Sequence, residues 1–218
     1  MTTSVWFDLD GTLLDYTTSF GELFAQTLPV SASDEMVATY SEHVLSGIRQ
    51  MAERPYRRAF ESVGREYDLD IDPGALTAEY IEREAKATRV PEPVTRLVES
   101  IADRHQTGIL TNGTGRMQRR KIERHGLDGP VDSVVVSNEL GSRKPSTDIF
   151  EEAKKRLPAE TVIYIGDTFE EDILPARSAG FDTVYIGEET RSATPVTARR
   201  TEELAAVLLP LMGELPTG

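Results

Sequence analysis

The sequence of 218 residues contains no cysteine, and this absence excludes three kinds of chemistry. Structural disulfides, catalysis by a thiolate and zinc sites built on cysteine all require that residue. No apolar run approaches the roughly 20 residues that a membrane-spanning helix needs. The first apolar segment follows directly after Met1–Ser4, so we expect no signal peptide. Together these absences predict a cytoplasmic protein without a membrane partner.

Lysine is also scarce, with five lysines against 19 arginines. The 37 acidic residues outnumber the 24 basic ones, and the formal net charge is −13. Because such a charge repels polyanions, we expect neither nucleic acid nor an anionic membrane as a partner. An acidic surface poor in lysine indicates a halophilic protein of a high-salt cytoplasm, where salt screens like charges. The alternative is an ordinary acidic protein, and we expect a monomer or homodimer in either case.

Hydrophobic residues make up 39% of the chain, enough for a packed core and too many for a disordered chain. Five short apolar runs predict strands at Val5–Phe7, Gly108–Leu110, Val134–Val136, Val162–Ile165 and Thr183–Ile186. Helical spacing predicts helices at Thr95–His105, Arg116–His125, Ser146–Leu157 and Glu202–Met212. This alternation predicts an α/β fold: a doubly wound, parallel, five-stranded, Rossmann-like sheet covered on both faces.

Residues 19–88 interrupt this alternation, since they contain no strand-like run. They predict helices only: one after a capping box at Ser31–Asp34, one opened by Pro55 and one opened by Asp72-Pro73. The segment Val90–Pro93 is typical of a hinge. We therefore predict a core domain formed by residues 1–18 and 89–218, with an all-helical domain inserted at 19–88.

Two aspartates follow the first predicted strand, in the stretch Val5–Asp15. Side chains two residues apart on a strand point the same way, so Asp8 and Asp10 can face one site. Sites in open parallel sheets form at the carboxyl ends of the strands. Two carboxylates there favour a divalent cation and a phosphate. An acidic turn is the simpler interpretation, but it leaves two acids beside a buried strand end without a cation.

Four segments resemble, in order, the motifs of the haloacid dehalogenase-like (HAD) hydrolase superfamily. They are Asp8–Leu13, Ile109–Gly113, Lys144-Pro145 and Gly166–Asp172. Singly, the second and third are better explained as an ordinary turn and a surface lysine, and the fourth equally well as an acid at a helix start or as a site residue. Their common order along essentially the whole chain carries the resemblance. It implies that the insertion at 19–88 is a helical cap domain of the C1 type.

The resemblance implies a Mg²⁺-dependent phosphomonoester hydrolase that acts on a small phosphorylated metabolite through an aspartyl-phosphate. Asp8 would be the nucleophile and Asp10 the general acid and base. The phosphate would be bound by Thr111, Asn112, Gly113 and Lys144, and Lys144 would also stabilise the transferring group. Asp8, the main-chain carbonyl of Asp10 and Asp167 would hold Mg²⁺, with Asp172 as a weaker candidate.

Two other reactions of the same superfamily stay open at this point. In 2-haloacid dehalogenases the carboxylate at the Asp10 position is generally absent, and phosphohexose mutases differ in cap residues that this sequence does not identify. A non-catalytic binding protein is least favoured, because all five chemical positions are present. Pro175 stands where the family usually has a small residue. The insertion's arginines, Arg49, Arg54, Arg57 and Arg58, either balance nearby acids, the simpler interpretation, or reach an anionic substrate.

Overall fold

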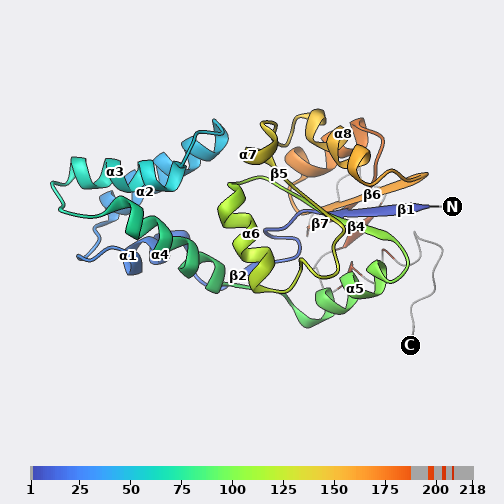
Figure 1. Cartoon of the computed structure of the whole chain (residues 1–218), viewed down its shortest axis with the longest axis horizontal. Coiled ribbons are helices and arrows are strands. Elements are labelled where there is room, and N and C mark those ends of the chain that lie inside the picture. Colours follow the sequence, from blue (N-terminus) through green and yellow to red (C-terminus); the bar gives the residue numbers. More distant parts are fainter. Residues whose placement is uncertain (1, 188–195, 199–202, 205–207, 209–218) are drawn as a thin grey trace.

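The computed structural model of the chain describes residues 2–187, 196–198, 203–204 and 208. A parallel sheet with helices on both faces forms one part of the molecule, and helices α1–α4 form a group beyond it (Figure 1). The predicted helix at Glu202–Met212 falls mostly outside the described residues. Within them, no helix is long and apolar enough to cross a membrane.

The sheet has the strand order β5-β4-β1-β6-β7-β8, and every neighbouring pair is parallel. Its strands are β1 (Thr3–Phe7), β4 (Gln106–Thr111), β5 (Ser133–Val136), β6 (Thr161–Gly166), β7 (Asp182–Ile186) and β8 (Thr197–Ala198). The doubly wound parallel sheet is confirmed, and all five predicted strands are present. The strand number of five was wrong, because the two residues of β8 are too short to produce an apolar run.

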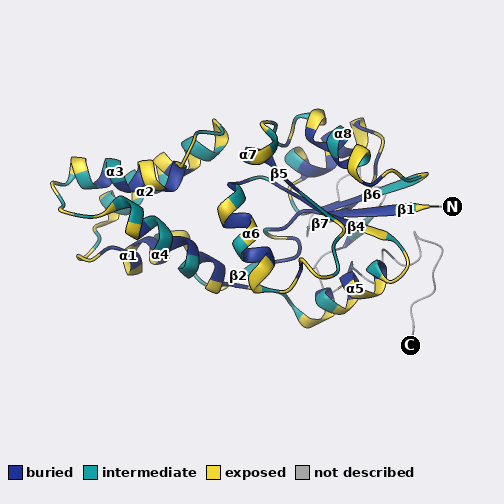
Figure 2. Ribbon diagram, in the orientation of Figure 1, coloured by how far each residue is buried: buried dark blue, intermediate teal, exposed yellow. Residues whose placement is uncertain are grey.

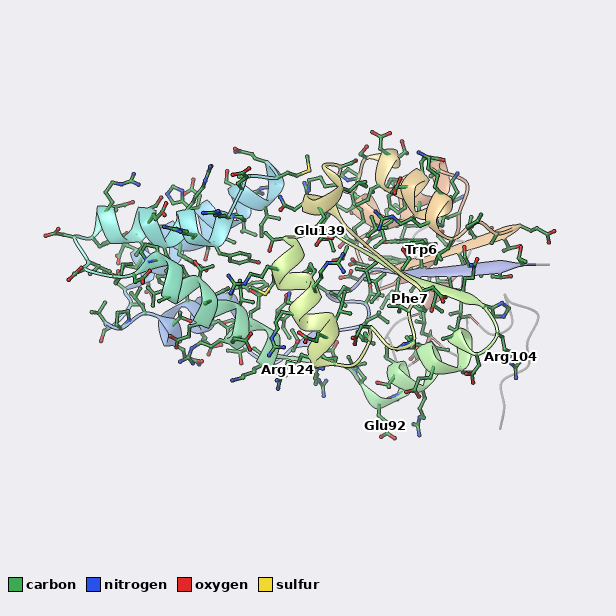
Figure 3. The ribbon with its side chains drawn as sticks, in the orientation of Figure 1. Trp6, Phe7, Glu92, Arg104, Arg124 and Glu139 are labelled. Carbon is green, nitrogen blue, oxygen red and sulfur yellow. The ribbon has the colours of Figure 1, made fainter. Side chains whose placement is uncertain are left out.

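The two faces of the sheet are covered by different helices. Helices α5 (Glu92–Ala102) and α6 (Gly115–Arg124) pack on one face, and α8 (Thr147–Arg156) and α9 (Leu174–Ser178) on the other. Successive residues of β1 alternate between them: Phe7 packs with α5, and Trp6 with α8 (Figure 3). The central strands are buried on both sides (Figure 2), which explains their continuous apolar runs.

The inserted helices are α1 (Phe20–Thr27), α2 (Asp34–Arg49), α3 (Pro55–Glu66) and α4 (Pro73–Lys86). They enclose a separate apolar cluster that contains Phe24, Tyr40, Phe60 and Tyr80. Two short antiparallel strands, β2 (Asp15–Tyr16) and β3 (Thr88–Arg89), pair where the chain enters and leaves them. This arrangement supports the proposed domain boundaries, 19–88 inserted between 1–18 and 89–218.

The helix starts in the insertion follow local sequence signals. Pro55 and Pro73 open α3 and α4, and the Asp72 carboxylate caps α4, as predicted. The predicted capping box at Ser31–Asp34 was wrong. The N-cap of α2 is Ser33, whose Oγ accepts from the Met36 amide. A reciprocal capping box instead starts α1, which the apolar pattern did not reveal.

Candidate active site

The carboxyl ends of β1, β4 and β6 bring three of the sequence motifs together. Strand β1 lies between β4 and β6, and the Asp8 amide donates to the Ile165 carbonyl at 2.9 Å. Asp8 follows β1, Asn112 follows β4 and Asp167 follows β6. Since the connection from β5 to β6 crosses over β1, this edge is the switch point at which sites form in doubly wound sheets.

Lys144 comes from the loop between α7 (Ser137–Leu140) and α8 and reaches the same point. Its Nζ lies 2.8 Å from Asp8 Oδ1 and 2.5 Å from Asp172 Oδ1, and it donates to the Tyr164 hydroxyl at 3.1 Å. Burial by itself lowers the pKa of Lys144, but the two carboxylates outweigh burial and raise it. Lys144 is therefore a buried ammonium that orients the Asp8 carboxylate.

Asp172 holds Lys144 in place through a buried ion pair. It is only 1% exposed, and its Oδ1 also accepts from the Tyr164 hydroxyl at 3.0 Å. Its Oδ2 accepts from the Thr168 amide at 3.0 Å. Because both oxygens already have donors, Asp172 is better suited to anchoring Lys144 than to direct metal binding. Tyr164 was not among the site residues predicted from the sequence, because its place inside the apolar strand β6 marked it as core.

The carboxylates of Asp8, Asp167 and Asp172 form a cluster with the chemistry of a metal site. One oxygen of each lies within 4.8 Å of the others. Burial, with the charges of Asp172 and Asp167, raises the pKa of Asp8 against the opposing effect of Lys144. Burial and the charge of Asp172 raise the pKa of Asp167 to about 6. Negative charge thus exceeds what Lys144 neutralises, and hard oxygen donors of this kind fit Mg²⁺.

Gly11 is required beside this cluster for two separate reasons. Its φ is +83°, in the left-handed region, and a Cβ at this position would overlap the Asp167 carboxylate. Thr12, the next residue, donates to Asp167 Oδ1 at 3.4 Å. The turn after Asp10 therefore holds Asp167 against the end of β1.

The Asp10 carboxylate points to α6 and not to Lys144. It accepts from the Tyr16 hydroxyl at 2.9 Å, from Gln118 Nε2 at 2.7 Å and from Lys121 Nζ at 3.0 Å. Burial alone would raise the pKa of Asp10, but the Lys121 charge and these three hydrogen bonds together lower it. Asp10 is therefore held in the ionised form.

Lys121 joins Asp10 to the helical insertion. It is 1% exposed, and its Nζ also lies 2.7 Å from Glu84 Oε1 on α4. The Tyr16 hydroxyl oxygen lies 3.2 Å from the same Glu84 oxygen. We refer to Asp10, Tyr16, Glu84 and Lys121 as the buried ion network. It ties a helix of the insertion directly to a predicted catalytic carboxylate.

None of these partners of Asp10 was predicted from the sequence. A signal for two of them exists on α6. Gln118 and Lys121 are three residues apart, so they share one side of the helix, and that side also carries the apolar Met117 and Ile122. Polar side chains on a buried helical face need partners. Such a pair indicates a buried polar site, although it does not identify Asp10 as the partner.

The residues at the end of β4 and directly after it have different roles. Thr111 Oγ1 accepts from Gln118 Nε2 at 2.8 Å, which places the hydroxyl near Asp10. The Asn112 side chain binds the Lys144 backbone in both directions, with Oδ1 accepting from its amide at 3.0 Å and Nδ2 donating to its carbonyl at 3.1 Å. The Gly113 amide donates to Ser137 Oγ at 3.0 Å. Asn112 and Gly113 thus fix the loops around Lys144, and phosphate binding by this segment stays a prediction.

A cavity of about 380 Å³, here called the first cavity, opens above these groups. The residues that line it include Asp10, Asp167, Gln118 and Lys121 from the sheet region and Ile48 and Tyr56 from the inserted helices. Its size is that of a site for a small molecule. A ligand here would lie between the insertion and the acidic ends of β1 and β6.

Comparison with known proteins gives one family match. The family described as haloacid dehalogenase-like hydrolase matches residues 5–186. The chain is 29% identical to the glyceraldehyde 3-phosphate phosphatase of Methanothermobacter thermautotrophicus, over 88% of this chain and 89% of the relative. It is 26% identical to the ribulose-1,5-bisphosphate 5-phosphatase of Halopiger xanaduensis, over 99% of this chain and 98% of the relative.

Solved structures show the same fold. The putative HAD-hydrolase YfnB of Bacillus subtilis, solved bound to magnesium, matches with a TM-score of 0.70 at 22% identity. The match covers 94% of this chain and 97% of that structure. It therefore includes the sheet and the inserted helices alike.

Proposed function

This chain belongs to the haloacid dehalogenase-like hydrolases, and we propose that it hydrolyses phosphate monoesters of small metabolites with Mg²⁺ as its cofactor. The observation that carries the proposal is the contact of 2.8 Å between Lys144 Nζ and Asp8 Oδ1, with Asp167 in the same carboxylate cluster. The two curated relatives, both phosphatases by description, support phosphate chemistry.

In this proposal Asp8 is the nucleophile. Lys144 holds one oxygen of its carboxylate, and the other attacks phosphorus, so that the bond to the leaving oxygen breaks and an aspartyl-phosphate forms. Water then attacks the phosphorus, which releases inorganic phosphate and restores Asp8. The Lys144 ammonium stabilises the negative charge of the transferring group in both steps.

Asp10 is the proposed acid and base. The leaving alkoxide takes a proton from it, and the attacking water gives a proton back. Because the Lys121 charge and the hydrogen bonds of Asp10 lower its pKa, the free protein favours the ionised form, which accepts the proton of water; the proton for the leaving alkoxide is taken up from solvent beforehand. Its three donors fix the carboxylate at the wall of the first cavity.

Asp8, Asp167 and the main-chain carbonyl of Asp10 are the proposed ligands of Mg²⁺. When bound, the ion offsets the repulsion between the anionic nucleophile and the anionic substrate. Asp172 contributes through Lys144, as its hydrogen bonds indicate. The magnesium-bound relative of known structure supports this choice of metal.

Dehalogenation of 2-haloacids is a weaker proposal for this site. A halide leaves without a proton, so that reaction has no use for an acid at Asp10 held by three donors. It also has no use for a second metal-binding carboxylate at Asp167. Cytoplasmic location and a monomeric or homodimeric state stay predictions.

The test of the proposed function is hydrolysis of p-nitrophenyl phosphate. We expect activity that requires Mg²⁺, stops with EDTA and is abolished in Asp8→Asn. Asp70→Asn, which changes an exposed carboxylate in a loop of the insertion, is the matched control and should keep full activity. Full activity in Asp8→Asn, or metal-independent chloride release from a 2-chloroacid, would contradict the proposal.

A further inference from the structure

A second cavity, of about 470 Å³, lies beside the first. Tyr56 lines both of them. The backbone that lines the first cavity at Asn112 and Gly113 continues into the second as Thr114–Arg116. Three residues of extended chain span at most about 10 Å, so the two cavities are near neighbours. One small metabolite can therefore have a group in each.

The second cavity is cationic although the chain is strongly acidic. Arg54, Arg57 and Arg116 line it, and none of the described residues that line it is an aspartate or glutamate. Arg57 pairs with Glu61 at 2.9 Å. Arg54 and Arg116 have no ion-pair partner among the described residues. In a chain of net charge −13, unpaired arginines at a cavity indicate an anionic ligand.

Helix α6 adds backbone donors to the same cavity. Its first residues, Gly115 and Arg116, line the cavity, and its N-cap residue Thr114 makes no side-chain capping bond. The first amides of a helix lack intrahelical partners and carry the positive end of the helix dipole. A phosphate or carboxylate in the cavity would accept from these amides and from the arginines at once.

The loop between α2 and α3 is built to present Arg54. Both Met51 and Arg54 have positive φ, 51° and 53°, a conformation that residues other than glycine adopt at a cost. The Met51 carbonyl accepts from Asn138 Nδ2 at 3.3 Å, which attaches the loop to α7 at a residue that lines the second cavity. Strained backbone held by a contact of this kind is typical of a functional loop.

We infer that the second cavity binds a second anionic group of the substrate, while the phosphate to be hydrolysed lies at Asp8. This inference rests on the proposed phosphatase function and narrows its substrate class. The substrates are small metabolites with two anionic groups, such as bisphosphates or phosphorylated carboxylic acids. The arginine cluster of the insertion then has two parts, because Arg54 and Arg57 line this cavity and Arg58 does not.

Three linear substrates with the same five-carbon chain test the inference. They are 1,5-pentanediol bisphosphate, 5-phosphopentanoate and 1,5-pentanediol monophosphate, which differ only in the group remote from the hydrolysed phosphate. We expect the wild-type protein to have a higher kcat/KM for the two compounds that carry a second anionic group than for the monophosphate. The ratio between the bisphosphate and the carboxylate shows which anion the cavity prefers.

The variant R54Q/R116Q should lose this selectivity. Hydrogen bonds to charged groups correspond to about 10- to 100-fold in affinity, so kcat/KM for the bisphosphate should fall by that factor. The kcat/KM for the monophosphate, which carries no second anionic group, should fall by much less than that factor. The matched control is R58Q/R65Q, which removes two exposed arginines of α3 that do not line the cavity, and it should keep the selectivity.

The outcomes separate this inference from the proposed function. If p-nitrophenyl phosphate is hydrolysed but the wild-type protein treats the three linear substrates alike, only the second-anion site is wrong. It is equally wrong if R54Q/R116Q and R58Q/R65Q behave the same. If no phosphate ester at all is hydrolysed in the presence of Mg²⁺, the proposed function itself is wrong.

Discussion

The buried ion network allows one prediction to be worked out in detail, for the substitution Lys121→Met. Methionine keeps the unbranched side chain and most of its volume, so packing changes little. The ammonium is lost, and the carboxylates of Glu84 and Asp10 lose their shared cation. Glu84 is only 2% exposed, so water cannot replace the lost partner.

The structure indicates the size of the effect. Removing one partner of a buried ion pair typically destabilises a protein by about 3–5 kcal/mol. The Asp10 side chain is 28% exposed, so water screens part of its charge, and we expect the lower end of that range. A loss of about 3 kcal/mol corresponds to roughly 10 °C in Tm for a protein of this size.

The assay is urea or thermal unfolding of the metal-free protein, followed in a double-mutant cycle with Glu84→Gln. Once Lys121 is gone, neutralising Glu84 removes an unpaired charge, so the double variant should be more stable than the sum of the single effects. A coupling of about 1–3 kcal/mol is expected for residues in direct contact. Lys155→Met, on the exposed side of α8, is the control and should stay within about 0.5 kcal/mol of the parent protein.

Two results would refute this reasoning. One is a Lys121→Met protein as stable as the parent, which would mean that Asp10 and Glu84 do not need the Lys121 charge as a partner. The other is simple additivity with Glu84→Gln, which would mean that Lys121 and Glu84 are not in contact in solution.

Three further predictions follow from the site and the composition. Gly11→Ala should lose more activity than Gly141→Ala, since both glycines have positive φ but only Gly11 faces a side chain, Asp167; equal losses would show that backbone strain alone is responsible. Because the pKa of Asp167 is raised to about 6, the folded metal-free protein holds its proton longer than the unfolded chain. The contribution of Asp167 to the stability of the fold should therefore fall as pH rises from about 4 to 6. The difference in Tm between the parent and Asp167→Asn should change over this pH range. A difference in Tm that is independent of pH would contradict the raised pKa of Asp167. Finally, Tm should be higher in molar KCl than in dilute buffer, and a Tm indifferent to salt would argue against the halophilic interpretation.

The sheet and the ends of its strands could be predicted from sequence because the signals are local. A buried parallel strand is an apolar run, and the residue after it lies at the carboxyl edge. Asp8 is found in this way, whereas Asp167 was identified through the resemblance to the superfamily's fourth motif. The direction of Asp10 could not be, because the alternation of side chains holds only within a strand, and β1 ends at Phe7. Beyond that point the turn at Gly11 directs the Asp10 carboxylate to α6.

The partners of the site residues could not be predicted for a different reason. Lys121 is 111 residues from Asp10 in sequence, and Asn112 is 32 residues from Lys144. No periodic pattern links positions so far apart, since their contact depends on how helices are placed on the sheet. Arg54 and Arg57 were open to two interpretations for the same reason, because only the folded chain shows that they line the second cavity, and Arg116 was not among the arginines considered.

The antiparallel pairing of β2 and β3 has a consequence for how such an enzyme can evolve. Because the chain leaves the core at Asp15–Tyr16 and returns beside it at Thr88–Arg89, the segment between can be altered or exchanged without moving the ends of β1, β4 and β6. The inserted segment, which would select the substrate, and the strand ends, which would carry out the chemistry, can then change independently during evolution. Tyr16 sets the limit of that independence, because it belongs to this junction and also donates to Asp10.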